Sequence, residues 1–361
     1  MKQAALLLVL LSAGLFGCRG ERPAPAATAP TPQRIIALTP SVEETLFALG
    51  LGTRVVGVGD YCRWPPEVRS LPQLGGLFNP NLERIVALKP DLAVLIPSER
   101  DLAAKLGRLG VDSLIVREES LADVEQSFRT IGERCGVPEA GERLAAQWRQ
   151  DMAPHPLSWK PKVMISVGRQ SGRLADVLVA GPGTFFDEIL VRMGGVNAFG
   201  DAKTLYPQVS LEEVVARAPD VILEMRAERL KPDVTAALVN DWRQLPQVPA
   251  VQRGAVAVLA GDYVVIPGPR LPRLAVDMRA VLEGASPTGK QVRRDAPVRW
   301  QGRPESSIVG ASQRLWSVTV SFSAIRAAGG LPALRRPGVC GPGRGLPTDW
   351  AVSTGRCADI R

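Results

Sequence analysis

The chain of 361 residues is long enough for two domains, and its apolar fraction of 45% is ordinary for a globular protein. Its net charge of +8 lies entirely in residues 286–361, which hold one Lys, eleven Arg and four acidic residues. The rest of the chain sums to zero, which argues against a nucleic-acid partner. Five cysteines without a CxxC spacing and a single histidine, His155, argue against a zinc site built by the protein.

The first 18 residues are typical of an export signal, with Lys2 at the start and a short apolar run before Cys18. Residues 15–18 resemble a bacterial lipobox, in which Cys18 is acylated and becomes the mature N-terminus; cleavage as a plain signal peptide is the alternative. Residues 19–33 are rich in Pro and Ala, which is typical of a flexible tether. We therefore expect a periplasmic or otherwise extracytoplasmic lipoprotein held at a membrane.

Residues 34–119 alternate apolar strands with helical patterns, which predicts an α/β lobe with a parallel sheet covered on both faces. Strands are expected at 34–38, 54–58 and 111–116, and a helix at 100–109. Ser41 and Glu44 have the spacing of a capping box, which predicts a helix over 42–49 that ends at Gly50.

Residues 120–160 have a helical pattern interrupted at 136–138, which predicts a linking segment between two lobes. Residues 161–285 return to the α/β pattern, with a strand at 163–167, a helix capped by Thr184 and a last helix that ends near Glu283. Residues 286–361 are rich in Arg, Gly and Pro, which is typical of a disordered tail. A functional basic extension and the product of a reading-frame change are the two explanations considered for it.

One phrase occurs twice at a constant offset of 129: Leu82-Glu83 to Pro90-Asp91, and Leu211-Glu212 to Pro219-Asp220. Each copy predicts a short helix that ends before Pro and is followed by an apolar strand. The constant offset indicates one folding unit used in both lobes. Equivalent positions would place Glu83 and Glu212 on one rim, spaced to meet two basic sites of a symmetric partner; solvated surface charge is the alternative.

Aromatic residues make up only 5% of the chain, yet several fall in predicted loops at one end of the strands. They are Tyr61, Trp64, Phe78, Tyr206 and Tyr263. Core packing is a common role for such rings, but their presence in loops of both lobes favours a cleft that stacks against a large flat ligand. Asp262 and Arg270 are expected to meet polar edges of that ligand. No Gly-x-Ser-x-Gly motif occurs, and one histidine leaves little room for a triad, so we expect no enzyme activity.

The export signal, residues 34–41 and both copies of the repeated phrase resemble the periplasmic cobalamin-binding proteins of ABC importers. These belong to a wider family of carriers for haem and ferric siderophores, and the resemblance covers about residues 34–283. It implies two Rossmann-like α/β lobes with parallel sheets, joined by one long α-helix, with the ligand held between them. It also implies a monomer that delivers cobalamin, or vitamin B12, or a related corrinoid to an ABC permease without a catalytic cofactor.

By position, the resemblance implies that Tyr61, Trp64, Tyr206 and Tyr263 contact the corrinoid. It further implies that Glu83 and Glu212 dock onto arginines of the permease. Leu77-Phe78, Tyr206 and Tyr263 stand where tryptophan is expected, so haem or a ferric siderophore is the alternative ligand.

The position of His155 in the link disfavours haem ligation through histidine, whereas Tyr61, Tyr206 or Tyr263 could bind haem iron. A more distant alternative is an envelope enzyme or a sensor domain whose basic tail contacts anionic lipid. Removal of residues 286–361 would abolish membrane binding by such a sensor and leave the affinity of a carrier unchanged.

Overall fold

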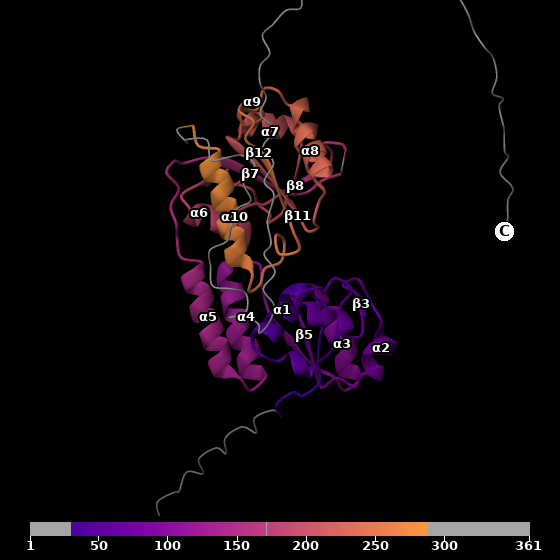
Figure 1. Cartoon of the computed structure of the whole chain (residues 1–361). Helices are drawn as coiled ribbons and strands as arrows, with labels where there is room; N and C mark the ends of the chain where they lie inside the picture. Colours follow the sequence, from indigo (N-terminus) through magenta and orange to yellow (C-terminus); the bar gives the residue numbers. More distant parts are fainter. Residues whose placement is uncertain (1–29, 171, 288–361) are drawn as a thin grey trace, which may run out of the picture. The chain divides into compact units, whose positions relative to one another are not determined.

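The computed structural model describes residues 30–170 and 172–287, which form two α/β lobes joined by a pair of helices (Figure 1). The predicted export signal with Cys18, most of the predicted tether and the residues from 288 onward lie outside these described residues. Within residues 30–170 and 172–287, no helix is both long and apolar enough to cross a membrane.

The N-terminal lobe is built on four parallel strands in the order β2-β1-β5-β6. The strands are β1 (Ile35–Ala37), β2 (Val55–Val58), β5 (Leu92–Leu95) and β6 (Asp112–Ile115). Every residue of β1 and β5 is buried, as expected for a parallel sheet with helices on both faces. The helices are α1 (Pro40–Ala48), α2 (Leu82–Ala87) and α3 (Arg100–Arg108), and a hairpin of β3 (Gly75–Gly76) and β4 (Asn79–Pro80) precedes α2.

The C-terminal lobe has a mixed sheet in the order β10-β8-β7-β11-β12, and β9 pairs with β7 beside this path. The strands are β7 (Lys162–Gly168), β8 (Val177–Val179), β9 (Val196–Asn197), β10 (Gln208–Val209), β11 (Val221–Arg226) and β12 (Val256–Ala260). The helices are α6 (Phe185–Arg192), α7 (Leu211–Arg217), α8 (Pro232–Asp241), α9 (Pro249–Gln252) and α10 (Leu271–Gly284). The expectation of parallel pairing holds for β7, β11 and β12. Strand β8, in contrast, pairs antiparallel with both of its neighbours, β7 and β10.

Two helices of 14 residues each, α4 (Leu121–Arg134) and α5 (Pro138–Asp151), lie side by side between the lobes in the chain (Figure 1). The single long helix that the resemblance implied is thus replaced by a helical hairpin that turns at Gly136, where φ is 73°. Ile131 packs into the N-terminal core, and Trp148 packs into the core that contains α10. The hairpin is therefore built into the cores of both lobes.

The repeated phrase has the same structure in both lobes, as its constant offset predicted. The side chains of Asn81 and Ser210 each accept a hydrogen bond from the backbone three residues further on, and so cap α2 and α7. The carboxylates of Asp91 and Asp220 each accept a backbone N–H at the start of the first strand of their lobe. One folding unit is therefore used twice.

The predicted capping box of α1 is wrong. The helix begins at Pro40, its N-cap is Thr39, and no side chain caps it. Ser41 is buried in the first turn, and the Glu44 carboxylate pairs with Arg270 instead of returning to the helix start. Thr184 does cap α6 as predicted, because its side chain accepts a hydrogen bond from the backbone of Asp187.

Candidate functional site

Two exposed aromatic rings of the N-terminal lobe lie on neighbouring loops. Tyr61 is 66% exposed and Phe78, at the tip of the β3–β4 hairpin, is 93% exposed. Asp60 holds the loop to the hairpin, because its N–H donates to the Gly75 carbonyl at 3.0 Å. A Cβ atom on Gly76 would lie 3.7 Å from Cε2 of Tyr61, which places that ring against the hairpin. We refer to Tyr61 and Phe78 as the aromatic platform, which the described residues leave largely uncovered.

Tyr206, in the C-terminal lobe, is 42% exposed and lies on a loop fixed beside β8. The N–H of Gly181 donates to the Leu205 carbonyl at 2.7 Å, and the N–H of Val179 donates to the Pro207 carbonyl at 3.0 Å. Burial, and then the nearby carboxylates of Glu119 and Glu118, raise the pKa of Tyr206 to about 12. Its hydroxyl therefore stays protonated at neutral pH, and acidic groups surround it.

Trp64 and Tyr263 are less exposed than expected for loop residues whose rings stack against a ligand. Trp64 is half-buried, and Arg270 stacks on its ring with Cζ 5.2 Å from the centroid. Tyr263 is only 3% exposed, its hydroxyl donates to the Asp277 carboxylate, and it belongs to the core around α10. The structure therefore gives Tyr263 a packing role, with Cζ of Arg270 also 6.0 Å from the centroid of its ring.

Arg270 and Asp262 are likewise engaged with protein groups. Arg270 donates through Nε and Nη2 to the two carboxylate oxygens of Glu44, at 2.9 and 2.5 Å. Through Nη1 it donates to Asp262 at 3.0 Å. Burial alone would lower the pKa of Arg270, but Glu44 and Asp262 outweigh it and raise that pKa, so the guanidinium remains charged.

Three carboxyl groups of the N-terminal lobe follow the carboxyl ends of its strands; Glu43 and Glu99 are buried and Glu118 is half-buried. Burial, reinforced by Glu44 and opposed by Arg270, raises the pKa of Glu43 to about 10. Burial also raises the pKa of Glu99 to about 7, opposed by a backbone hydrogen bond from Ile96. The pKa of Glu118 rises to about 7, again chiefly by burial. This edge of the lobe is thus acidic in composition but only partly charged at neutral pH.

Glu83 and Glu212 lie in the first turns of α2 and α7, and both are exposed. Neither makes an ion pair or hydrogen bond with any other described residue. Each follows a capping residue at the same distance, so the two side chains leave equivalent helices from equivalent positions.

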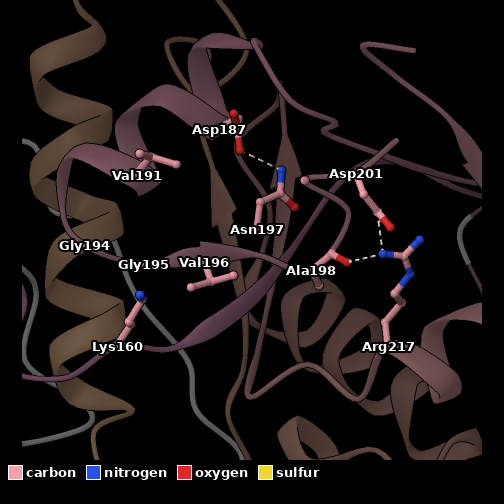
Figure 2. Close-up of a pocket in the computed structure, with 11 residues that line it drawn as sticks. Lys160, Asp187, Val191, Gly194, Gly195, Val196, Asn197, Ala198, Asp201 and Arg217 are labelled. Atoms are coloured by element: carbon pink, nitrogen blue, oxygen red, sulfur yellow. Dashed lines mark hydrogen bonds and ion pairs between the residues drawn. The ribbon is translucent and has the colours of Figure 1, made fainter. Parts of the chain in front are cut away.

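A separate pocket of about 810 Å³ opens in the C-terminal lobe (Figure 2). It is lined by Lys160, Asp187, Val191, Gly194, Gly195, Val196, Asn197, Ala198, Gly200, Asp201 and Arg217. Its polar groups largely satisfy one another: Asp187 accepts from Asn197 at 2.9 Å, and Arg217 pairs with Asp201. Its wall β9 pairs with the first residues of β7, whereas ligands of α/β sheets bind beyond the carboxyl ends of strands. This pocket is not the predicted ligand site.

No described residues form a group of three or more His, Cys, Asp and Glu arranged to hold a metal ion. Cys62 and Cys135 are free and buried, and burial is the largest cause that raises the pKa of both thiols. Sequence analysis missed the role of Glu44. Glu44 contacts Arg270 far along the chain, and Glu188 of the other lobe likewise makes a long-range contact, with the N–H of Leu121.

Residues 35–263 match the family described as periplasmic binding protein. A vitamin B12-binding protein of Vibrio cholerae serotype O1 is 30% identical over 244 residues, which cover 66% of this chain and 84% of that protein. The solved structure of the periplasmic vitamin B12 binding protein of Vibrio cholerae has a TM-score of 0.58 at 28% identity, over 70% of this chain and 98% of that one. A periplasmic heme-binding protein from Roseiflexus sp. RS-1 has a TM-score of 0.59 at 27% identity, with the same coverage.

Proposed function

The chain belongs to the periplasmic binding protein family, and we propose that it captures cobalamin or a related corrinoid outside the cytoplasm and delivers it to an ABC transporter permease. The observation that carries this proposal is the set of exposed rings Tyr61, Phe78 and Tyr206, on loops of both lobes. The similarity to vitamin B12-binding relatives supports it. The export signal supports an extracytoplasmic carrier, anchored through a lipid on Cys18.

The proposed binding mode is apolar enclosure of a flat macrocycle. The platform of Tyr61 and Phe78 would cover one side, and Tyr206 would meet the ligand from the other lobe, with half-buried Trp64 at the edge. Aromatic rings each bury roughly 150–250 Å² when covered, so three or four of them supply a large apolar contact. Such capture breaks no bond in the ligand, so it requires no catalytic group and no enzyme activity.

The acidic surroundings of Tyr206 favour a corrinoid over haem. A haem carries two propionates, which Glu119 and the ionised fraction of Glu118 would repel, whereas a corrin ring carries neutral amides at its edge. Haem iron in this fold would also need a ligand from the protein. Because the pKa of Tyr206 is raised to about 12 and Tyr263 is bonded to Asp277 in the core, neither phenol is suited to bind iron as a phenolate.

Glu83 and Glu212 are proposed as the docking groups for two basic sites of the permease. Their exposure, the absence of partners among the described residues and their equivalent positions in the repeat support this role. The cap fixes the backbone at the start of each helix, so the two glutamates leave their lobes from equivalent backbone positions and can meet two arginines of a symmetric partner.

The full chain should be titrated with cyanocobalamin by calorimetry, with haemin and a ferric siderophore in parallel. We expect saturable binding of one corrinoid per chain. Phe78→Ala should weaken it by about tenfold, the order of one lost stacking ring. Leu109→Ala is the matched control, because Leu109, the C-cap of α3, is 53% exposed but belongs to no predicted ligand loop, and it should leave affinity unchanged.

The haem alternative makes a different prediction for the same titrations. If the folded chain ignored cyanocobalamin and bound haemin, the ligand assignment would move to haem. Tyr61 would then be the candidate iron ligand, and Tyr61→Phe should abolish the haemin signal, whereas a stacking role predicts that this variant keeps most of its corrinoid affinity.

A further inference from the structure

Arg270 makes a bidentate bond to a glutamate of the other lobe. It directly precedes α10, and its Nε and Nη2 donate to the two oxygens of Glu44, which lies in α1. The Glu44 side chain is only 2% exposed and that of Arg270 14%. Parallel N–H···O bonds of this kind fix the plane of the guanidinium as well as its distance.

The same guanidinium also contacts groups that surround the proposed ligand site. Its Nη1 donates to Asp262 at 3.0 Å, and its Cζ lies 5.2 Å from the centroid of the Trp64 ring. Three of its five N–H groups are therefore used within the protein. This leaves little capacity for the direct ligand contact that the sequence predicted for Arg270.

We propose that Arg270 is a positioning residue: held by Glu44 and Asp262, it fixes the Trp64 ring for stacking against the ligand. This inference rests on the proposed function. In this arrangement the Trp64 ring forms a wall of the ligand site that is already in place before the ligand binds. Glu44 and Asp262 orient the Arg270 guanidinium, which in turn holds the ring. The sequence separation of 226 residues between Glu44 and Arg270 means that the wall is completed only when both lobes have folded.

The chemistry of the contact explains why arginine is required. A guanidinium is planar, so it can stack on the indole while its edge donates to Glu44; a lysine ammonium would keep the charge but lose the fork and the stack. Positioning of this kind improves affinity because the ring has no rotamer freedom left to lose when the ligand binds.

The test is a double-mutant cycle with Arg270→Lys and Trp64→Ala, read by cyanocobalamin affinity in the full chain. Arg270→Lys keeps a cation beside Glu44, so the fold is expected to survive. We expect it to weaken binding about tenfold in the parent chain, the order of one cation–π contact, and to cause no further loss when Trp64 is already absent. A loss of equal size in both backgrounds, or no loss in either, would overturn the proposal.

A readout without ligand separates this inference from the proposed function. Acrylamide quenching of Trp64 is obtained as the difference between the parent chain and Trp64→Phe. Arg270→Lys should make that fluorescence more quenchable, whereas Arg273→Lys, which alters a stack on buried Tyr263 with Cζ 4.2 Å from its centroid, should not. If the parent chain failed to bind cyanocobalamin, this measurement would still decide whether Arg270 holds the ring: unchanged quenching refutes the positioning role.

Discussion

Lys89 and Ala218 lie 129 positions apart and share a left-handed backbone, each with φ of 46°. Lys89 lies between α2 and Pro90, which precedes β5. Ala218 lies in the same way between α7 and Pro219, which precedes β11. The backbone must reverse there within two residues, and neither chain copy uses the glycine that would do so without strain. Both copies of the repeated unit therefore have the same strained backbone conformation directly after their helix.

Lys89→Gly and Ala218→Gly are therefore expected to stabilise the fold. A left-handed residue with a side chain costs roughly 1 kcal/mol, and each glycine should recover about that much free energy of unfolding. Urea denaturation would measure the change. Ala104→Gly in the exposed interior of α3 should instead lose about 1 kcal/mol, so a loss in all three variants would contradict the strain argument.

The buried ion pair of Arg169 and Glu224 should be far more sensitive than any surface pair. Both side chains are at most 1% exposed, and the Trp242 indole also donates to Glu224. Arg169→Met should lower the free energy of unfolding by about 3–5 kcal/mol, because it removes the cation from Oε2 of buried Glu224, which then pairs with Arg226 alone, and from Asp241. Thermal and urea unfolding would show this.

Two further variants serve as controls for the effect of Arg169→Met on stability. Arg217→Met removes partly exposed contacts with Asp201 and Glu213, whose side chains are 67% and 43% exposed, and should cost much less, about 1 kcal/mol. Adding Glu224→Leu to Arg169→Met should restore part of the loss, since the buried carboxylate with too few cations is then removed and Arg226, whose side chain is 16% exposed, can be solvated. A double variant that lost the sum of the two single losses would show that the whole network, rather than the excess buried charge, sets the cost.

Glu43 predicts a specific dependence of stability on pH. Its side chain is fully buried, its oxygens have no hydrogen-bond partner among the described residues, and its pKa is raised from 4.5 to about 10. Below pH 4.5 the carboxyl is protonated in both states. Above that pH the unfolded chain releases the proton while the folded chain keeps it, so this contribution is lost as pH rises toward 10.

Glu43→Gln should remove that dependence, because an amide of similar shape stays neutral at every pH. The gain over the parent chain should grow with pH, by up to about 1.4 kcal/mol per pH unit for a single group. Urea unfolding at pH 5, 7 and 8.5 would measure it. Glu67→Gln, at an exposed position, is the control; parallel curves for Glu43→Gln and the parent would refute the assignment.

The sequence could predict features that depend on local pattern. The apolar runs of β5 and β11, the caps at Asn81 and Ser210 and the order of elements in both lobes follow from neighbouring residues. The role of Glu44 could not be predicted in this way. Its spacing from Ser41 suits a capping box equally well, and its true partner lies 226 residues away.

The same limit applies to the aromatic residues. Tyr61 and Tyr263 both follow glycine and aspartate in predicted loops, yet one is exposed and the other is buried. The difference arises because α10 returns over Tyr263 and supplies Asp277 for its hydroxyl and Arg273 for its ring. The burial of Tyr263 depends on a helix that follows later in the chain, so the residues next to Tyr263 do not predict it.

The last prediction concerns docking through Glu83 and Glu212. Transporter-dependent uptake of cyanocobalamin should fall steeply when both carry Glu→Arg substitutions, because each new cation faces a basic site of the permease. The single variants should show intermediate losses of similar size, since the two helices are equivalent. Corrinoid affinity of the isolated chain should not change, as neither residue lies on a ligand loop.

Glu133→Arg, on the exposed end of α4, is the matched charge control. Normal uptake by the double variant would refute docking at this rim, whereas weakened corrinoid binding would show that the glutamates act on the ligand site.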